Sequence, residues 1–439
     1  MQIIKKPSRQ EWAELLKRPE IDTTSLFGTV GEVLENIRQN GDKAVFEYEL
    51  KFDKVQLSAL QVSAEEIAEA EPLVPHLLKE AISQAKRNIE KFHDAQNDEL
   101  PYMNVIPEVR CWQKRVAIQK VGLYIPGGTA PLFSTVLMLA IPAQLAGCEE
   151  IVLCSPPNTE GKIHPAVLYA ANLCGVTKIF KIGGAQAIAA MAYGTESVPK
   201  VYKIFGPGNQ YVTAAKQLIS LKNTAIDMPA GPSEVAIIAD NTAKPRYIAA
   251  DLLSQAEHGV DSQSILITTD ESLIVGVQEE VKSQLELLPR KDLAEKALQH
   301  SKIIYIPDIE EAIAFTNEYA PEHLIIMTHN YTVVAERIIN AGSVFLGEYS
   351  PESAGDYASG TNHTLPTNGY AKAYSGVHLD SFTKKITYQE LSREGLSMLS
   401  NAIEIMAENE SLIAHKNAVE VRLERVYRED EDYTDSWRR

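Results

Sequence analysis

Residues 178–192, KIFKIGGAQAIAAMA, contain the pattern that decides the fold: a short apolar strand, a glycine turn and an alanine-rich helix. Apolar segments at 121–125, 150–154 and 201–205 run in the same way into a turn rich in glycine or proline, and then into a helix. Four such units in succession are typical of a parallel sheet with helices on its faces. The sequence therefore predicts an α/β fold.

A second sheet is predicted after residue 233, because the same alternation of strands and helices resumes there. Apolar residues at three- and four-residue spacing also predict helices at 29–51 and 63–96, each charged on its opposite face. We expect these two helices to pack on the second sheet, which would make the first α/β unit an insertion in the second. The strands predicted in the second sheet are 235–239, 264–268, 303–306, 324–328 and 343–346.

The predicted domain organisation follows from these two sheets. A polar N-terminal arm precedes the first α/β domain, a second α/β domain is inserted into it, and a helical region with a charged tail closes the chain. The predicted ranges are 1–20 for the arm, 21–123 with 234–378 for the first α/β domain, 124–233 for the inserted domain, 379–427 for the C-terminal helices and 428–439 for the tail.

Composition narrows the classes of protein to which the chain can belong. Its 439 residues, 45% hydrophobic and 23% charged, are those of a soluble globular protein with more than one domain. The net charge of −17 argues against sequence-independent binding to nucleic acid. There is no apolar run of the roughly eighteen residues that a membrane span requires, and no signal-peptide core follows the basic N-terminus. We therefore expect a cytoplasmic protein without nucleic-acid or membrane partners.

The four cysteines show neither CxxC pairing nor dense spacing, which favours a reducing compartment. A nucleophilic thiol is common in aldehyde-oxidising enzymes. However, Cys148, Cys154 and Cys174 lie in or beside predicted buried elements and are interpreted as small hydrophobic residues. Cys111 has no assigned role.

Glu322 and His323 are adjacent in the run YAPEHLIIM, residues 319–327, between a proline and an apolar strand. A carboxylate can activate water and an imidazole titrates near neutrality, so the two form a candidate acid/base pair. For a motif this short, the alternative is a loop whose polar side chains only satisfy backbone groups.

Two further kinds of site are open on spacing alone. The three turns at 126–129, 183–187 and 206–210 each follow a strand and open a helix whose N-terminus suits phosphate. No GxGxxG or GxxxxGK[ST] occurs, so purely structural turns are equally compatible. Gln255 and His258 project from one face of a predicted helix, and Asp356 and His415 are further candidate metal ligands. Spacing leaves three more residues equally available: Glu257, His363 and His378.

Several runs taken together resemble the histidinol dehydrogenase family. They occur in the family's order and span roughly residues 20–426, which makes the resemblance specific. The runs are GLYIPGGTAPL (122–132), GGAQAIAA (183–190), FGPGN (205–209), IDMPAGPSEV (226–235), LLSQAEHG (252–259), YAPEHL (319–324), SAGDY (353–357) and HKNAVEVR (415–422).

This resemblance implies a cytoplasmic, zinc- and NAD-dependent oxidoreductase. Such an enzyme oxidises L-histidinol through L-histidinal and its hydrate to L-histidine, the final steps of histidine biosynthesis. It also implies two incomplete Rossmann-like domains, with parallel sheets flanked by helices, plus small helical N- and C-terminal pieces. Residues 124–233 would bind NAD, and residues 379–427 would form a homodimer whose active sites are shared between subunits.

The resemblance also implies roles for individual residues. One zinc ion per subunit would position the substrate, with Glu322 activating water and His323 acting as general base. The zinc ligands would be Gln255, His258 and Asp356, with His415 from the second subunit, and these residues would also contact the substrate. The further substrate contacts would be Ser233, His323 and Glu410, the last from the second subunit, and the NAD contacts would be Tyr124, Gln186 and Asn209.

Two alternatives stay open beside this interpretation. A related zinc and NAD dehydrogenase could act on another amino alcohol, which a substrate panel would decide. An α/β binding protein without activity would more naturally have lost one of the acid/base or ligand residues, and all of them are present.

Overall fold

The computed structural model describes residues 1–19, 23–98, 100–127, 130–222, 224–229 and 231–424. The chain divides into two compact units. The first contains Met1–Asn97 and Ala117–Thr383, and the second contains Asp98–Val116 and Lys384–Arg439. The charged tail predicted at 428–439 lies outside the described residues. Residues 128 and 129, in the glycine turn that follows residue 125, also lie outside them.

The first unit contains a five-stranded parallel sheet, in the order β6-β5-β4-β7-β8. The order reverses between β4 and β7, as in one half of a doubly wound nucleotide-binding fold. The predicted α/β class is therefore confirmed. The strands are β4 (Lys120–Tyr124), β5 (Glu150–Ser155), β6 (Lys178–Lys181), β7 (Lys203–Phe205) and β8 (Ala225–Ile226), connected by α5 (Phe133–Leu145), α6 (Pro165–Leu173), α7 (Gly184–Tyr193) and α8 (Gln210–Ser220).

The same unit contains a six-stranded parallel sheet, in the order β1-β11-β10-β9-β12-β13. Leaving out the edge strand β1, this is the same arrangement as in the five-stranded sheet. The strands are β1 (Gln2–Lys5), β9 (Glu234–Ala239), β10 (Gln263–Thr268), β11 (Lys302–Tyr305), β12 (His323–Met327) and β13 (Ser343–Leu346). The helices are α9 (Pro245–Ala256), α10 (Leu273–Leu285), α11 (Lys291–Ala297), α12 (Ile309–Tyr319) and α13 (Tyr331–Ala335).

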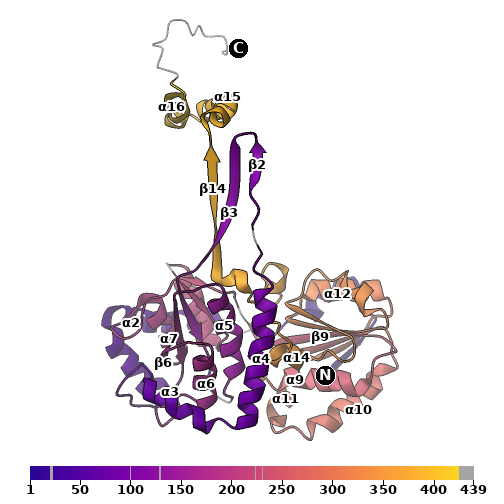
Figure 1. The fold of residues 1–439 in the computed structure, drawn as a ribbon. Coiled ribbons are helices and arrows are strands. Elements are labelled where there is room, and N and C mark those ends of the chain that lie inside the picture. The colour runs from indigo at the N-terminus through magenta and orange to yellow at the C-terminus, as the bar shows by residue number, and fades with distance from the viewer. Residues whose placement is uncertain (20–22, 99, 128–129, 223, 230, 425–439) are drawn as a thin grey trace. The chain divides into compact units, whose positions relative to one another are not determined.

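Both faces of the six-stranded sheet are covered, which explains why its central strands are continuous apolar runs. Val235 and Ile237 point to the face covered by α9 and α10, whereas Ala236 and Ile238 point to the face covered by α12. Figure 1 shows α12 on one side of β9, and α9, α10 and α11 on the other. Every residue of β9, β10 and β12 is buried, so these strands form a rigid base for groups at their ends.

The early helices correct one expectation about packing. Helices α2 (Phe27–Tyr48), α3 (Ala64–Ala70) and α4 (His76–Asp94) pack on the elements of the five-stranded sheet, not on the second sheet. The amphipathic pattern identified their buried faces, but periodicity carries no information about which sheet covers a face. The predicted domain ranges stay a proposal. The structure changes one point of them, because α2, α3 and α4 pack with the five-stranded sheet.

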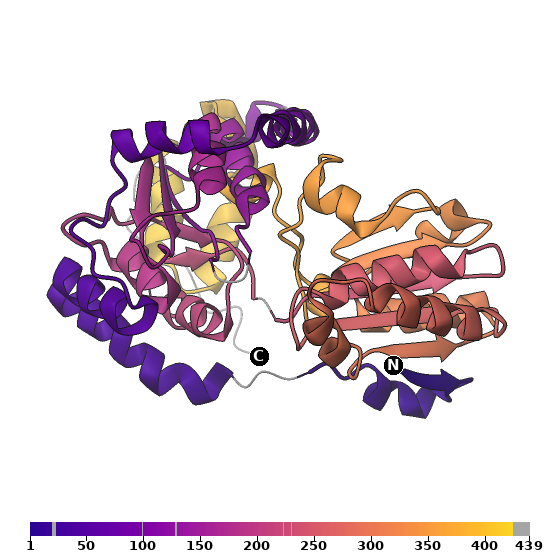
Figure 2. The ribbon, with the colours of Figure 1, turned by 90° about the horizontal axis from the view of Figure 1, so that it is seen from below.

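The N-terminal segment is more than the polar arm that the sequence predicts. Strand β1 pairs in parallel with β11 and forms one edge of the six-stranded sheet, and Figure 2 shows this indigo segment beside that sheet. A short helix, α1 (Trp12–Leu15), buries Trp12 against Phe315 of α12, with the ring centroids 5.1 Å apart. The segment is therefore anchored at both of its elements.

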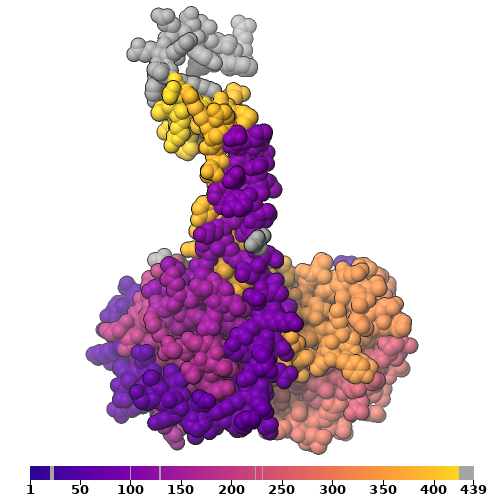
Figure 3. All heavy atoms as spheres, in the orientation of Figure 1, coloured from indigo at the N-terminus to yellow at the C-terminus, as the bar shows by residue number. Residues whose placement is uncertain are grey.

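The second unit consists of a small sheet and a pair of helices. Its strands are β2 (Met103–Ile106), β3 (Val109–Ala117) and β14 (Thr383–Leu391), in the order β14-β3-β2. Helices α15 (Arg393–Asn409) and α16 (Ile413–Arg422) follow, within the range 379–427 that the sequence predicts for the C-terminal helices. The observed helices begin later than this predicted boundary, because residues Thr383–Leu391 form β14, a polar strand without a buried apolar run. Figure 3 shows how slender the body of this unit is.

Among the described residues, the structure contains no helix with the length and apolar character needed to span a lipid bilayer.

Candidate active site

Glu322 and His323 lie at the start of β12, at the amino edge of the six-stranded sheet. Helix α12 ends at Ala320 in a left-handed conformation (φ 53°), and Pro321 then directs the chain into the strand. Both side chains are buried. Ligands of open α/β sheets usually bind at the opposite, carboxyl edge, so the position of this pair does not follow from the general rule.

The side chains of Glu322 and His323 lie next to each other, and that of Asp356 lies beside the imidazole. Nδ1 of His323 lies 3.6 Å from Oε2 of Glu322, and Nε2 lies 3.4 Å from Oδ1 of Asp356. Burial raises the pKa of Glu322 to about 8, although His323 opposes the effect. A carboxyl group that titrates near the working pH is suited to both giving and taking a proton.

His323 is surrounded by carboxylates. Burial alone lowers its pKa, but Glu352, Glu322 and Asp356 together outweigh burial and raise this pKa well above the ordinary value. In this chain alone these carboxylates therefore favour the protonated imidazole. Neutralisation of the carboxylates by another cation would leave it free to act as a base.

A group of possible metal ligands lies beside the pair. Ligand atoms of His258, Glu352 and Asp356 all lie within 4.8 Å of one another. His258 follows the end of α9, and the two carboxylates lie one turn apart on the short helix α14 (Glu352–Tyr357). Nitrogen and oxygen donors in this arrangement suit zinc. The structure thus brings together His258 and Asp356, as the resemblance implies.

Glu352 is a residue of this group that the sequence analysis missed. It precedes Asp356 by four positions, and residues with this spacing on a helix share a face. Burial raises the pKa of Glu352 well above the ordinary value, and the charge of His323 opposes this effect. A search for carboxylates one helical turn from Asp356 would have identified it.

Gln255 lies on α9 and is fully buried among the same groups. With its amide nitrogen facing Glu352, it donates to both carboxylate oxygens at 3.1 and 2.6 Å, and its oxygen accepts from the backbone N–H of Glu234 at 3.2 Å. One turn earlier on α9, burial raises the pKa of Asp251 to about 7. The concentration of buried acidic groups favours a bound cation, because buried charges require a partner.

The other histidines and the remaining substrate contacts have different positions. His363 supports Asp356: its Nδ1 lies 2.9 Å from the Asp356 carbonyl oxygen, and its Nε2 lies 3.1 Å from Thr135 Oγ1. Ser233 is half-buried and immediately precedes β9. Glu410 and His415 belong to the second unit, where both are exposed, at the end of α15 and in α16.

The three predicted NAD contacts lie at the carboxyl edge of the five-stranded sheet, where each follows or ends a strand. Tyr124 ends β4, and its hydroxyl accepts from the Gly184 N–H at 3.0 Å. Gln186 opens α7 and is buried, whereas Asn209 caps α8 by accepting from the N–H groups of Tyr211 and Val212. Tyr124 and Asn209 thus end or follow the two strands on either side of the switch point between β4 and β7, and Gln186 belongs to the turn after the edge strand β6.

Gln186 is held by two acidic residues that the sequence analysis also missed. Its amide nitrogen donates to Glu49 Oε1 at 3.0 Å and to Asp53 Oδ2 at 3.2 Å. Glu49 Oε1 also accepts from the Gly183 N–H at 3.1 Å. Both carboxylates come from the π-helical turn Glu49–Asp53 that follows α2. The π-helical turn thus stabilises the glycine turn at 183–187 through these hydrogen bonds.

Glu49 should make the stability of the protein depend on pH. Burial, with a smaller effect of the Asp53 carboxylate, raises its pKa from 4.5 to about 8. Between these values the folded chain holds a proton that the unfolded chain releases, so the contribution to stability is full below about pH 4.5 and is lost as pH rises to about 8. We expect the free energy of unfolding, measured with urea from pH 5 to 8.5, to fall less steeply for Glu49→Gln than for the wild type.

The matched control is Glu47→Gln, which changes an exposed carboxylate on α2. Its urea profile should run parallel to that of the wild type. Identical slopes for Glu49→Gln and the wild type would show that Glu49 is not protonated in the folded protein.

Three of the four cysteines lie in or against the protein core, as the sequence predicts. Cys154 and Cys174 are buried in the core around the five-stranded sheet, and Cys148 packs against that core. Burial raises the pKa of the Cys148 and Cys174 thiols to about 12, so both are neutral at physiological pH. Cys111 lies in β3 of the second unit. Neutral thiols are poor nucleophiles, which agrees with chemistry carried by other groups.

Comparison with known proteins gives a consistent result. The family model described as Histidinol dehydrogenase matches residues 16–423. A Histidinol dehydrogenase of Bacteroides thetaiotaomicron is 66% identical over 423 residues, which cover 96% of this chain and 99% of that protein. One from Escherichia coli is 54% identical over 419 residues, covering 94% and 95% of the two chains. The crystal structure of Histidinol Dehydrogenase from Elizabethkingia anophelis has a TM-score of 0.95 at 55% identity, covering 97% and 98%.

Proposed function

The chain belongs to the histidinol dehydrogenase family, and from this premise we propose that it oxidises L-histidinol through L-histidinal to L-histidine, the last steps of histidine biosynthesis. It is an oxidoreductase. The observation that carries the proposal is the buried pair of Glu322 and His323, placed beside the cluster of His258, Glu352 and Asp356. We place the reaction in the cytoplasm, where thiols stay reduced.

The first step removes a hydride from the alcohol. His323 takes the hydroxyl proton while the hydride leaves to NAD, which yields the aldehyde and one NADH. The imidazole is buried, and its Nε2 faces the carboxylate of Asp356, so its orientation is set before substrate arrives. This preorganisation favours proton transfer at one defined atom.

The second step requires water to be added to the aldehyde. Glu322 takes a proton from this water as its oxygen bonds to the aldehyde carbon, and His323 gives the proton that it took in the first step to the former carbonyl oxygen, which completes the hydrate. His323 then takes a hydroxyl proton from the hydrate while a second hydride leaves to another NAD, giving the carboxylic acid and a second NADH. The pKa of about 8 for Glu322 suits the proton transfer at the first of these two events.

A zinc ion is the metal that we propose for this site. His258 and Asp356 would hold it together with Gln255 from the same helix face and His415 of a second subunit, one ion per subunit. When bound, zinc would position the imidazole and amino groups of the substrate and neutralise adjacent carboxylates. The buried acidic groups and the nitrogen and oxygen donors support this choice.

NAD would bind at the carboxyl edge of the five-stranded sheet. Tyr124, Gln186 and Asn209 make hydrogen bonds in the turns at this edge, and the turns after β4 and β7 border the switch point of the strand order. Backbone N–H groups at the starts of α7 and α8 offer donors for phosphate oxygens. No GxGxxG run is present, and side-chain hydrogen bonds hold these turns in shape.

The second unit supports a homodimer in which each subunit completes the site of the other. It carries many exposed apolar side chains, and a second copy of the chain is the partner that we propose for them. Glu410 and His415 are exposed in the same unit, as donation to another subunit requires. These exposed apolar residues include Tyr102, Met103, Val105, Met398, Ile405, Met406, Ile413 and Val421.

The test of the proposed function is the yield of NADH from L-histidinol. We expect about two NADH per histidinol consumed, since each of the two oxidations transfers one hydride. Zinc measured by mass spectrometry in the same preparation should approach one ion per chain, and removal of the ion by a chelator should abolish turnover. A zinc-loaded, folded protein that forms no NADH from histidinol, or forms it only from another amino alcohol, would contradict the proposal.

A further inference from the structure

We propose that Arg18 and Glu234 are positioning residues for the Glu322–His323 pair. This inference rests on the proposed function, because it assigns the two residues a role in the same reaction. Arg18 follows helix α1 in the N-terminal segment, and Glu234 is the first residue of β9. Neither residue belongs to the predicted ligands or substrate contacts.

Glu234 connects the two central strands at the edge where the pair lies. Its backbone N–H donates to Oε2 of Glu322 at 2.9 Å, and its own Oε1 accepts from the backbone N–H of Glu322 at 3.3 Å. The carbonyl oxygen of Glu234 lies 3.3 Å from Nδ1 of His323. One residue thus contacts the carboxylate of Glu322, the backbone of Glu322 and the ring of His323.

Arg18 holds Glu234 in this position. Its guanidinium makes a bidentate pair with the carboxylate, Nε to Oε2 and Nη2 to Oε1, the second at 2.9 Å. The side chain of Arg18 is 11% exposed and that of Glu234 is 2% exposed, so the pair is shielded from water. Bidentate, buried pairs of this kind fix geometry more strongly than exposed ones.

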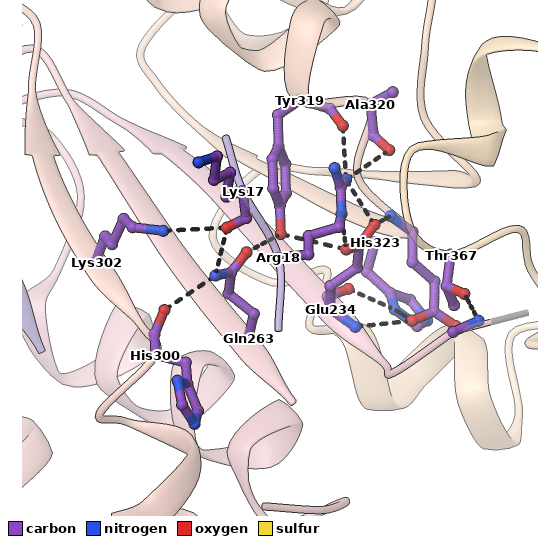
Figure 4. Close-up of polar contacts among 12 residues, drawn as sticks. Lys17, Arg18, Glu234, Gln263, His300, Lys302, Tyr319, Ala320, His323 and Thr367 are labelled. Atoms are coloured by element: carbon purple, nitrogen blue, oxygen red, sulfur yellow. Dashed lines mark hydrogen bonds and ion pairs between the residues drawn. The ribbon is translucent and has the colours of Figure 1, made fainter. Parts of the chain in front are cut away.

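Arg18 also holds the turn that leads into β12. Nη2 donates to the carbonyl oxygen of Tyr319 at 2.6 Å, and the guanidinium lies over the Tyr319 ring, 3.9 Å from its centroid. The Tyr319 hydroxyl lies 2.8 Å from Oε1 of Gln263, the first residue of β10. Figure 4 shows Arg18 between Glu234 and the Tyr319–Ala320 turn, with His323 beside Glu234. Arg18 therefore contacts both segments that hold Glu322 in place: Glu234 at the start of β9, and the Tyr319–Ala320 turn that leads into β12.

The charge of Arg18 matters as much as its hydrogen bonds. Glu322, Glu352 and Asp356 already concentrate negative charge beside His323. Glu234 adds a further buried carboxylate next to Glu322, and Arg18 neutralises it. Loss of the guanidinium would leave Glu234 unpaired and would favour rearrangement of the contacts with Glu322.

The test compares the two oxidations in Arg18→Ala. We expect the kcat for histidinal oxidation to fall about ten- to a hundredfold, as misplacement of a catalytic group does, while the KM for NAD changes less than about twofold. Added guanidinium at millimolar concentration should restore part of this kcat, since it can occupy the vacated place. Arg18→Lys should lie between Ala and the wild type, because an ammonium cannot form the bidentate pair.

Arg9→Ala is the matched control, because it removes an exposed guanidinium from the same segment. It should leave both kcat values unchanged. Should Arg18→Ala fail to fold in a thermal unfolding assay, Glu234→Gln serves as the second variant. We expect the same fall in its kcat for histidinal oxidation, with little change in the KM for NAD.

The outcomes separate this inference from the proposed function. A wild type that is inactive with histidinol sinks the proposed function. An active wild type, together with Arg18→Ala and Glu234→Gln variants that keep the wild-type kcat, overturns only the positioning role. The role is also overturned if guanidinium restores nothing and the loss lies in the KM for NAD, since that pattern indicates a general structural defect.

Discussion

Glu322→Gln should stall the reaction at the aldehyde, with histidinal oxidation slowed by about 10²- to 10⁴-fold, the contribution typical of general acid–base catalysis. Glutamine preserves the size of the side chain and an oxygen that accepts from the Glu234 N–H, a bond of 2.9 Å in the structure. It cannot take a proton from water. Oxidation of histidinol to histidinal should be slowed much less, because that step relies on His323. Single-turnover NADH formation from each substrate separates the two steps.

The control for this substitution is Glu318→Gln, which changes an exposed carboxylate on α12 a few residues before the pair. It should leave both oxidations at the wild-type rate. If Glu322→Gln slowed histidinol oxidation while histidinal oxidation was untouched, Glu322 would serve the first proton transfer and the roles of the pair would have to be exchanged.

The two sheets could be predicted because their central strands are buried on both faces. Runs such as residues 235–239 and 324–327 are apolar throughout, and turns rich in glycine or proline punctuate the alternation of strands and helices. Strand β14 lacked this signal because its residues are polar and mostly exposed. The destination of α2 and α4 could not be predicted either, since an amphipathic helix records that one face is buried but not which sheet buries it.

The candidate site divides in the same way. His258, Asp356, Glu322 and His323 have side chains suited to metal binding or proton transfer, so residue type made them candidates beside others, and the family resemblance singled them out. Nothing in the sequence was a reason to select Arg18. It lies 216 positions from Glu234, and the two residues come together only in the folded chain. Its neighbours suggested a polar arm, whereas its guanidinium is almost fully buried. Long-range pairing of ordinary charged residues leaves no periodic trace in a sequence.

Mixing two inactive variants should test whether active sites are shared between subunits. His258→Asn and His415→Asn should each lose activity by about two orders of magnitude or more, because each removes a proposed zinc ligand. The two residues belong to different units of the chain. If His415 serves the site of the other subunit, a mixed dimer has one site with both defects and one site with neither. Random reassociation should then restore about a quarter of the wild-type activity.

The control is a mixture of His258→Asn with Asp356→Asn. Their ligand atoms lie in one cluster of the first unit, so every site of a mixed dimer keeps one defect and no activity should return. Absence of recovery from the His258→Asn and His415→Asn mixture, despite proven exchange of subunits, would mean that His415 acts within its own chain or not at all. Recovery in that mixture and none in the control would require a second subunit at each site, because no single chain in the mixture carries both histidines.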